Sequence, residues 1–374
     1  MYGLFAMMNS NFVVKTGGGI VNSALSLGIP GSKWLVKQTV FRQFCGGETI
    51  QACRPVIEEL ARFGIGTILD YSVEGEGNEA AYDATAHEIL ATVAMAKTAG
   101  PAKIPFSVFK VTGLADVELL ARAQSGKPLT EHQQAALERG LARVDAICKA
   151  AHAAGVRVFV DAEESWIQDT IDRWTLTMMR RYNTARAIVY NTYQLYRHDR
   201  LSAFQADVAE GEAAGFHVGA KLVRGAYLEK ETRRAQQQNY ANPMNPTKQA
   251  TDDLYDAAVR FALAHLARVA VCVGTHNEES SRLGIELMQQ HGIAPADERV
   301  YFAQLYGMSD NLSYNLAAAG YRVAKYVPYG PVEAVMPYLL RRANENTAIA
   351  GQSSREFLLI QKELNRRKRA RANG

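Results

Sequence analysis

Eight short runs of β-branched and apolar residues alternate with segments of helix length, and this alternation constrains the fold more than any other feature of the chain. Neighbouring parallel strands need crossover helices, so the pattern indicates an α/β fold with a parallel sheet. Eight repeats in 374 residues favour closure into a (β/α)8 barrel, which takes about 250 residues or more. An open doubly wound sheet is the competing fold. The predicted strands are residues 67–72, 105–110, 156–161, 187–193, 218–224, 269–275, 300–305 and 322–326.

Amphipathic stretches between these runs predict the helices. A lead-in of helical or irregular structure is expected over residues 1–45, the barrel over residues 46–350 and a basic tail over residues 351–374. The predicted helices are residues 48–63, 80–97, 130–154, 167–182, 201–214, 251–267 and 281–291.

Composition excludes several classes of protein. A net charge of +4 with no basic patch interleaved with aromatics gives no reason to expect nucleic-acid binding. The four cysteines lack the spacing of metal ligands and the density of a disulfide scaffold. No apolar run is long enough to span a bilayer, so any membrane contact is expected to be peripheral. The acid-free start before Glu48 and the run from Asn365 to Arg371 are the segments that could supply it.

Polar residues follow all eight predicted strands, where a barrel keeps its active site. Each alone could be a helix cap or part of a buried network. Polar groups at all eight strand ends are harder to explain that way, because repeated desolvation of polar and charged groups without a function is costly. These positions include Asp70, Lys110, Asp161, Gln194, Lys221, Arg224, Thr275, Gln304 and Tyr326.

The segment after the last strand has helical periodicity and puts Tyr338, Arg341, Arg342 and Glu345 on one face. Paired guanidinium groups beside a tyrosine could hold a small carboxylate, because arginine offers donors that match two oxygens. The simpler interpretation is a surface helix with an Arg341–Glu345 pair, worth about 0.2–0.5 kcal/mol. Its position after the final strand favours a site.

No short motif announces a phosphate or a metal. The stretch from Gly75 to Ala80 matches the G-x-G-x-x-G/A pattern, but Glu74, Glu76 and Glu79 would repel a pyrophosphate. We therefore interpret it as an acidic loop and expect no metal site.

The motifs at the strand ends, taken together, resemble the FAD-dependent proline dehydrogenases of the monofunctional type. The resemblance covers residues 39 to 365, and the strand 5 and last-helix motifs are specific. It rests on the segments 68–74, 160–163, 221–227, 275–277, 304–308, 325–330 and 338–345.

The resemblance implies a distorted (β/α)8 TIM-like barrel with FAD across the strand ends and the last helix over the site. Arg341, Arg342 and Lys110 would hold the carboxylate of L-proline. Tyr326, Tyr338 and Leu222 would wall the ring, with Asp161 orienting Tyr326 and Glu74 pairing with Arg341 as a gate. The catalytic set also includes Glu345. The implied cofactor-binding residues are Gln194, Lys221, Arg224, Gly225, Ala226, Tyr227, Thr275, His276 and Asn277.

The implied reaction transfers a hydride from proline C5 to FAD N5 and yields 1-pyrroline-5-carboxylate, the first step of proline catabolism. Electrons would pass to a membrane quinone, with the protein peripheral to the inner membrane in the bacterial cytoplasm or, alternatively, in the mitochondrial matrix. In the family, relatives that oxidise 4-hydroxyproline tend to carry a small residue at the position of Tyr326, which here favours proline.

Two rival functions remain open from the sequence. A barrel aldolase or lyase could use Lys110 or Lys221 as a Schiff-base amine. An inactive barrel could serve as a scaffold at a membrane.

Overall fold

The computed structural model describes residues 34, 37–73, 77–336, 338–339, 362, 365 and 366. The chain forms two compact units. One comprises residues 1–53, 72–74 and 328–374, and the other comprises residues 54–71 and 75–327. Most of the predicted lead-in and nearly all of the predicted tail lie outside the described residues.

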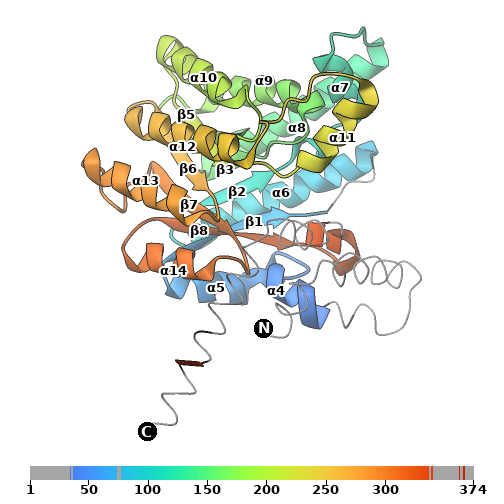
Figure 1. Cartoon of the computed structure of the whole chain (residues 1–374). Coiled ribbons are helices and arrows are strands. Elements are labelled where there is room, and N and C mark those ends of the chain that lie inside the picture. Colours follow the sequence, from blue (N-terminus) through green and yellow to red (C-terminus); the bar gives the residue numbers. More distant parts are fainter. Residues whose placement is uncertain are drawn as a thin grey trace. The chain divides into compact units, whose positions relative to one another are not determined.

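Eight parallel strands close into a barrel in sequence order, which confirms the (β/α)8 prediction and rules out the open sheet. Figure 1 shows the strands inside a layer of helices. Each predicted strand is present, and its ends differ from the predicted ones by at most three residues. The strands are β1 Ile65–Tyr71, β2 Phe106–Phe109, β3 Arg157–Val160, β4 Val189–Gln194, β5 Val218–Val223, β6 Val269–Gly274, β7 Val300–Leu305 and β8 Val323–Tyr329.

All seven predicted helices are present, the first of them, α5, before β1, and three helices between or after strands were not predicted: α7, α11 and α14. Residues 332–336 are also helical. The helical elements are η1 Lys37–Phe41, α4 Arg42–Phe44, η2 Gln51–Cys53, α5 Arg54–Arg62, α6 Glu79–Ala99, η3 Val111–Gly113, α7 Val117–Gln124, α8 Glu131–Ala154, α9 Ser165–Tyr182, α10 Arg200–Ala214, α11 Leu228–Gln238, α12 Lys248–Ala264, α13 Glu278–Gln290 and α14 Asp310–Ala318.

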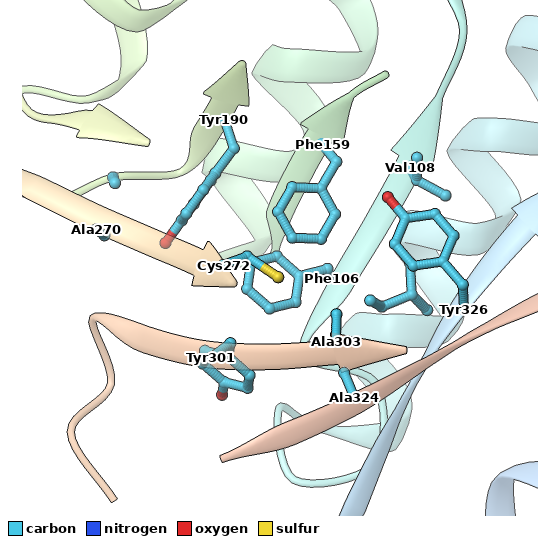
Figure 2. Close-up of a cluster of buried hydrophobic side chains, with 12 residues drawn as sticks. Phe106, Val108, Phe159, Tyr190, Ala270, Cys272, Tyr301, Ala303, Ala324 and Tyr326 are labelled. Carbon is cyan, nitrogen blue, oxygen red and sulfur yellow. The ribbon is translucent and has the colours of Figure 1, made fainter. Parts of the chain in front are cut away.

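Aromatic side chains fill the inside of the barrel (Figure 2). The rings of Phe106 and Phe159 stack with centroids 4.2 Å apart, and Tyr190 meets both edge-on at 5.4 Å. Tyr326 stacks on Phe159 from the strand-end side at 6.2 Å. Since successive side chains of a strand point to opposite faces, the residues two positions further along these strands also point inward. This packing directs Asp161 and Lys110 toward the barrel axis.

The last strand was predicted to end at residue 326, but β8 continues through Pro328 to Tyr329. Proline donates no ladder hydrogen bond, but its carbonyl accepts one from Gly46 N at 2.9 Å. Gly47 forms a parallel bridge with Tyr329, and Ser72 N donates to the Tyr329 carbonyl at 3.2 Å. A short segment far away in sequence therefore extends the strand past the proline.

Candidate active site

Five polar side chains from five different strands meet at the carboxyl end of the barrel. The Lys110 ammonium lies 3.6 Å from Asp70 Oδ1 and 3.5 Å from Asp161 Oδ2. The other oxygen of Asp161 accepts hydrogen bonds from Lys221 Nζ and, at 3.1 Å, from the Tyr326 hydroxyl. Lys221 Nζ also donates to Tyr326 Oη at 2.6 Å. We call Asp70, Lys110, Asp161, Lys221 and Tyr326 the strand-end cluster.

Charges alternate through the strand-end cluster, and this fixes the protonation of its members. Burial opposes ionisation of Asp161, but the Lys221 and Lys110 ammonium groups outweigh it and lower the pKa of Asp161. Burial likewise opposes the charge on Lys110, yet Asp70 and Asp161 raise its pKa. Burial and the Asp161 carboxylate raise the pKa of Tyr326 well above its usual value. At neutral pH the cluster therefore keeps Lys110 charged, Asp161 ionised and Tyr326 protonated.

Two aromatic rings lie close to the Lys221 ammonium. Its Nζ lies 4.6 Å from the centroid of the Tyr326 ring and 5.2 Å from that of Phe159. Both distances are within the range of cation–π attraction, which strengthens when the cation is desolvated. The Lys221 side chain is only 6% exposed. This cation is thus fixed in position before any ligand binds.

A second group of predicted residues meets at the ends of β5 and β6, with Arg224 at its centre. Arg224 donates to Asp252 Oδ1 at 2.6 Å, to Thr275 Oγ1 at 2.8 Å and to Ser280 Oγ at 3.0 Å. Its guanidinium carbon lies 4.3 Å from the centroid of the Tyr255 ring. The structure thus joins two of the predicted cofactor-binding residues, Arg224 and Thr275, directly.

The loop after β5 needs its glycine. Gly225 has a φ of +132°, and a Cβ there would come within 2.5 Å of the Tyr196 ring. Ala226 and Tyr227 follow it with half-buried side chains. A larger residue at position 225 would therefore push this loop away from the end of β4.

The side chains of His276 and Asn277 both form hydrogen bonds with neighbouring parts of the chain. Asn277 Oδ1 accepts from Glu279 N at 2.8 Å and Ser280 N at 3.2 Å, so its side chain caps helix α13. His276 Nδ1 lies 2.9 Å from Ser309 Oγ. The capping alternative considered for single strand-end residues thus holds for Asn277, and its contact with a cofactor stays a prediction.

Two other predicted residues do not reach the strand-end cluster. Gln194 is buried and donates through Nε2 to the Glu163 carbonyl at 2.7 Å. Leu222 is completely buried, and as the residue after Lys221 it points to the opposite face of β5. The predicted contact of Leu222 with a substrate ring stays a prediction that this side-chain direction does not support.

The structure describes only some of the residues predicted on the last helix. Tyr338 is 5% exposed, and the apolar side chains Val335, Met336 and Leu339 are buried as predicted. Four predicted site residues lie outside the described residues: Glu74, Arg341, Arg342 and Glu345.

Sequence reasoning missed the role of three acidic residues, Asp70, Asp252 and Glu163. Asp70 was noted only as a strand-end residue, although it sits two residues after the inward-facing Ile68 and therefore shares its face. Asp252 lies inside a helix, where no local pattern marks it as the partner of Arg224. Glu163 accepts from Thr112 N at 3.0 Å and from the Thr112 hydroxyl, and so ties the loop after β3 to the loop that follows Lys110.

Burial raises the pKa of Glu163 to about 7, against the two hydrogen bonds from Thr112 that favour its ionised form. The side chain is 3% exposed. Because the folded pKa exceeds the ordinary value of 4.5, the folded state binds this proton more tightly than the unfolded state does. Glu163 therefore contributes stability below about pH 4.5 that is lost as pH rises toward 7, up to about 3 kcal/mol.

We expect Glu163→Gln to remove this pH dependence, because glutamine keeps the shape and the hydrogen bonds of the protonated acid. Urea unfolding should give equal free energies for variant and wild type at pH 4.5. At pH 8.5 the variant should be more stable by about 1–3 kcal/mol. The exposed Glu212→Gln should show no difference at either pH. A pH-independent offset for Glu163→Gln would contradict the assignment.

Comparison with known proteins matches this architecture. The family model for proline dehydrogenase matches residues 53–355. Proline dehydrogenase 1, mitochondrial, from Dictyostelium discoideum is 33% identical over 405 residues, which cover 96% of this chain and 70% of the relative. The human protein of the same name is 43% identical over 267 residues, which cover 69% of this chain and 44% of the relative.

A solved structure shows the same fold. Proline utilization A from Bdellovibrio bacteriovorus, inactivated by N-propargylglycine, superposes with a TM-score of 0.82 at 17% identity over 93% of this chain and 38% of that one. The chain thus spans less than half of the length of the human relative and of this bacterial protein. The family match and the level of identity establish that the chain belongs to the proline dehydrogenase family of oxidoreductases.

Proposed function

We propose that the chain oxidises L-proline to 1-pyrroline-5-carboxylate, the first step of proline catabolism, with FAD as cofactor and a quinone as electron acceptor. Family membership supports the substrate and the reaction. The observation that carries the proposal is the strand-end cluster, in which Lys110 stays charged while Lys221, Asp161 and Tyr326 form a fixed hydrogen-bonded group.

Lys110 is the proposed carboxylate ligand among the described residues. Within the part of the chain that the structure describes, no carboxylate oxygen lies closer to its ammonium than 3.5 Å, and its side chain is 29% exposed. It is therefore charged, reachable and held between two carboxylates rather than locked onto one. Arg341 and Arg342 are proposed to share the substrate carboxylate, with Glu74 and Glu345 as their acidic partners and Tyr338 as a wall of the site.

Asp161 and Lys221 are proposed to hold Tyr326 against the substrate ring. Both groups bind the Tyr326 hydroxyl, so its ring has one orientation. A fixed Tyr326 ring helps to hold the substrate in the reactive orientation. Such positioning lowers the activation free energy of the reaction. The amine of proline must be neutral when the ring is oxidised, and solvent is proposed to take its proton.

The donors at the ends of β5 and β6 fit a flavin dinucleotide. Arg224 supplies a cation suited to phosphate and Thr275 a hydroxyl. His276, whose ring nitrogens contact Ser309 and Leu305, supplies the face of its imidazole ring. Gly225 keeps a side chain out of this loop. When bound, the flavin supplies the two-electron acceptor for the hydride that leaves proline C5. Arg224, Thr275 and His276, together with Gln194, Lys221, Gly225, Ala226, Tyr227 and Asn277, are the residues proposed to hold it.

The aldolase alternative is disfavoured by the same cluster. A Schiff-base lysine needs a neutral amine, which proteins obtain by desolvation or by a nearby cation. Here two carboxylates raise the pKa of Lys110, and Lys221 is paired with Asp161. Lys110 therefore stays protonated and the Lys221 amine is engaged by a carboxylate, which suits anion binding and not attack on a carbonyl.

Transfer of electrons to a quinone is proposed to take place at a membrane surface, in the bacterial cytoplasm or, alternatively, in the mitochondrial matrix. Within the described residues, no helix is both long enough and apolar enough to cross a bilayer. The basic run from Arg366 to Arg371 could supply peripheral attraction of about 1 kcal/mol per cation. Cosedimentation of a tail-deleted protein with anionic vesicles tests this, and undiminished binding would exclude the tail.

The proposed function is tested on purified protein by identifying its cofactor and its reaction. Denaturation should release FAD, and L-proline should drive reduction of an artificial electron-accepting dye. Colourless protein that borohydride links covalently to a carbonyl substrate would support the aldolase instead. Protein that does neither would support the inactive scaffold.

Replacing Tyr326 by serine should shift specificity from proline toward 4-hydroxyproline. The side chain is buried, and its removal opens space beside Lys221 that a ring hydroxyl could fill. We expect the ratio of kcat/KM for hydroxyproline to that for proline to rise at least about tenfold, which is about 1.4 kcal/mol. Tyr326→Phe keeps the volume and should leave the ratio near that of the wild type. An unchanged ratio in Tyr326→Ser would contradict the role of the ring.

A further inference from the structure

A buried lysine lies on the outer side of β8, next to Tyr326 but outside the strand-end cluster. Lys325 is completely buried, and since Tyr326 points into the barrel, Lys325 points away from it. A charge without solvent is costly unless hydrogen bonds satisfy it. Its ammonium donates to the Leu305 carbonyl at 3.3 Å, to the Met308 carbonyl and to Asp310 Oδ1 at 2.9 Å. All three acceptors belong to the β7–α14 loop and its two ends, residues 305–310.

The β7–α14 loop has an unusual backbone that needs support. Ser309 has a φ of +49°, one of two described residues other than glycine with a positive φ. That conformation is uncommon for a residue with a Cβ. The Ser309 carbonyl accepts from the Ser313 amide at 3.1 Å, and the Ser313 hydroxyl donates to Gln304 Oε1 at 2.8 Å. Lys325 binds Met308 and Asp310 on either side of Ser309, and Ser313 binds Ser309 itself, so the two residues together support this conformation.

The β7–α14 loop and its first residue contact both ring nitrogens of His276. Ser309 Oγ lies 2.9 Å from Nδ1, and the Leu305 amide points at Nε2 over 3.4 Å. A backbone amide can only donate, so Nε2 accepts and the ring proton sits on Nδ1, where it is donated to Ser309. The contacts fix both the orientation and the tautomer of His276.

We propose that Lys325 is a positioning residue that sets His276 for the cofactor by clamping the β7–α14 loop. The inference rests on the proposed function, because it takes His276 to be a cofactor-binding residue. The three hydrogen bonds of Lys325 described above go to the loop and not to the strand-end cluster. Its charge acts through three acceptors that fix Ser309 and Leu305, and these two residues fix the imidazole.

The test compares the FAD dissociation constant of wild type and Lys325→Met, measured by equilibrium dialysis of the holoprotein. Methionine matches the length of lysine but leaves the three acceptors without their donor. We expect the constant to rise at least tenfold, while the KM for proline at saturating FAD stays within twofold. Lys103→Met, which removes a surface lysine paired with Glu58, should leave the FAD constant unchanged.

A double-variant comparison separates positioning from general loss of stability. If Lys325 acts through His276, Lys325→Met in a His276→Asn background should raise the FAD constant less than twofold further. Ser309→Ala removes one hydroxyl, and should weaken FAD binding in the wild type but not with His276→Asn; it replaces Lys325→Met if that variant does not fold. Equal effects in both backgrounds, or no effect in the wild type, would overturn the inference. Wild type without any FAD affinity would overturn the proposed function and the inference together.

Discussion

Asp161→Asn is expected to lower the free energy of unfolding by about 3–5 kcal/mol, because it leaves the buried Lys221 ammonium without its carboxylate and removes one of the two carboxylates beside Lys110. Asp161 accepts from Lys221 and Tyr326 and lies 3.5 Å from Lys110, and its side chain is 13% exposed. Asparagine keeps the shape but carries no charge. Since the orientation of Tyr326 and Lys221 also depends on it, kcat/KM for proline should fall at least about a hundredfold. Urea unfolding and dye-linked kinetics measure the two effects.

The matched control is Asp145→Asn on the surface. Asp145 also accepts from a cation, Arg181 at 2.8 Å, and from a tyrosine hydroxyl, Tyr182 at 2.9 Å, but its side chain is 31% exposed. Solvent screens that pair, so its loss should cost less than about 1 kcal/mol and leave activity unchanged. Equal effects of the two substitutions on stability and activity would show that burial does not increase the cost of removing the Asp161 charge.

Lys110→Met is expected to raise the KM for proline at least about 30-fold with a smaller change in kcat. Removing one partner of a desolvated charge pair typically costs about 2–5 kcal/mol, and Lys110 is the proposed ligand of the substrate carboxylate. Its loss weakens ground-state and transition-state binding alike, so the effect belongs in KM. Steady-state kinetics at saturating FAD measure it.

Lys103→Met serves as the control for Lys110→Met, because it removes a cation that pairs with Glu58 on the surface. A simple carboxylate inhibitor without an amine should lose affinity for Lys110→Met in parallel with proline. Retained affinity for both ligands would mean that Lys110 does not bind the carboxylate.

The barrel itself was predictable from sequence because each strand is a short apolar run with polar residues at its end. Once the strands close in order, Lys110, Asp161, Lys221 and Tyr326 must converge, since carboxyl ends of parallel strands share one rim. The hydrogen-bond partners of these residues, however, could not be predicted from the sequence. The bond from Asp161 to Tyr326 joins residues 165 positions apart, and nothing local to either residue marks it.

The three unpredicted helices are short or polar. In α11, Leu228–Gln238, only Glu231 and Ala235 are buried, so the segment lacks an apolar stripe. Helix α7, Val117–Gln124, has only eight residues, and its N-cap Asp116 is a weak sequence signal for a helix. Tertiary packing stabilises such segments, and a periodic pattern is too weak to predict them. The extension of β8 past Pro328 likewise depends on Gly46 and Gly47, which are distant in sequence.

We propose that a flavin at this barrel mouth accepts electrons from proline held over the strand ends. The decisive experiment is a visible spectrum of the purified protein, recorded before and after anaerobic addition of L-proline. We expect flavin absorbance that L-proline bleaches and that D-proline bleaches far less. Protein that binds FAD but keeps its full absorbance with excess L-proline would contradict it.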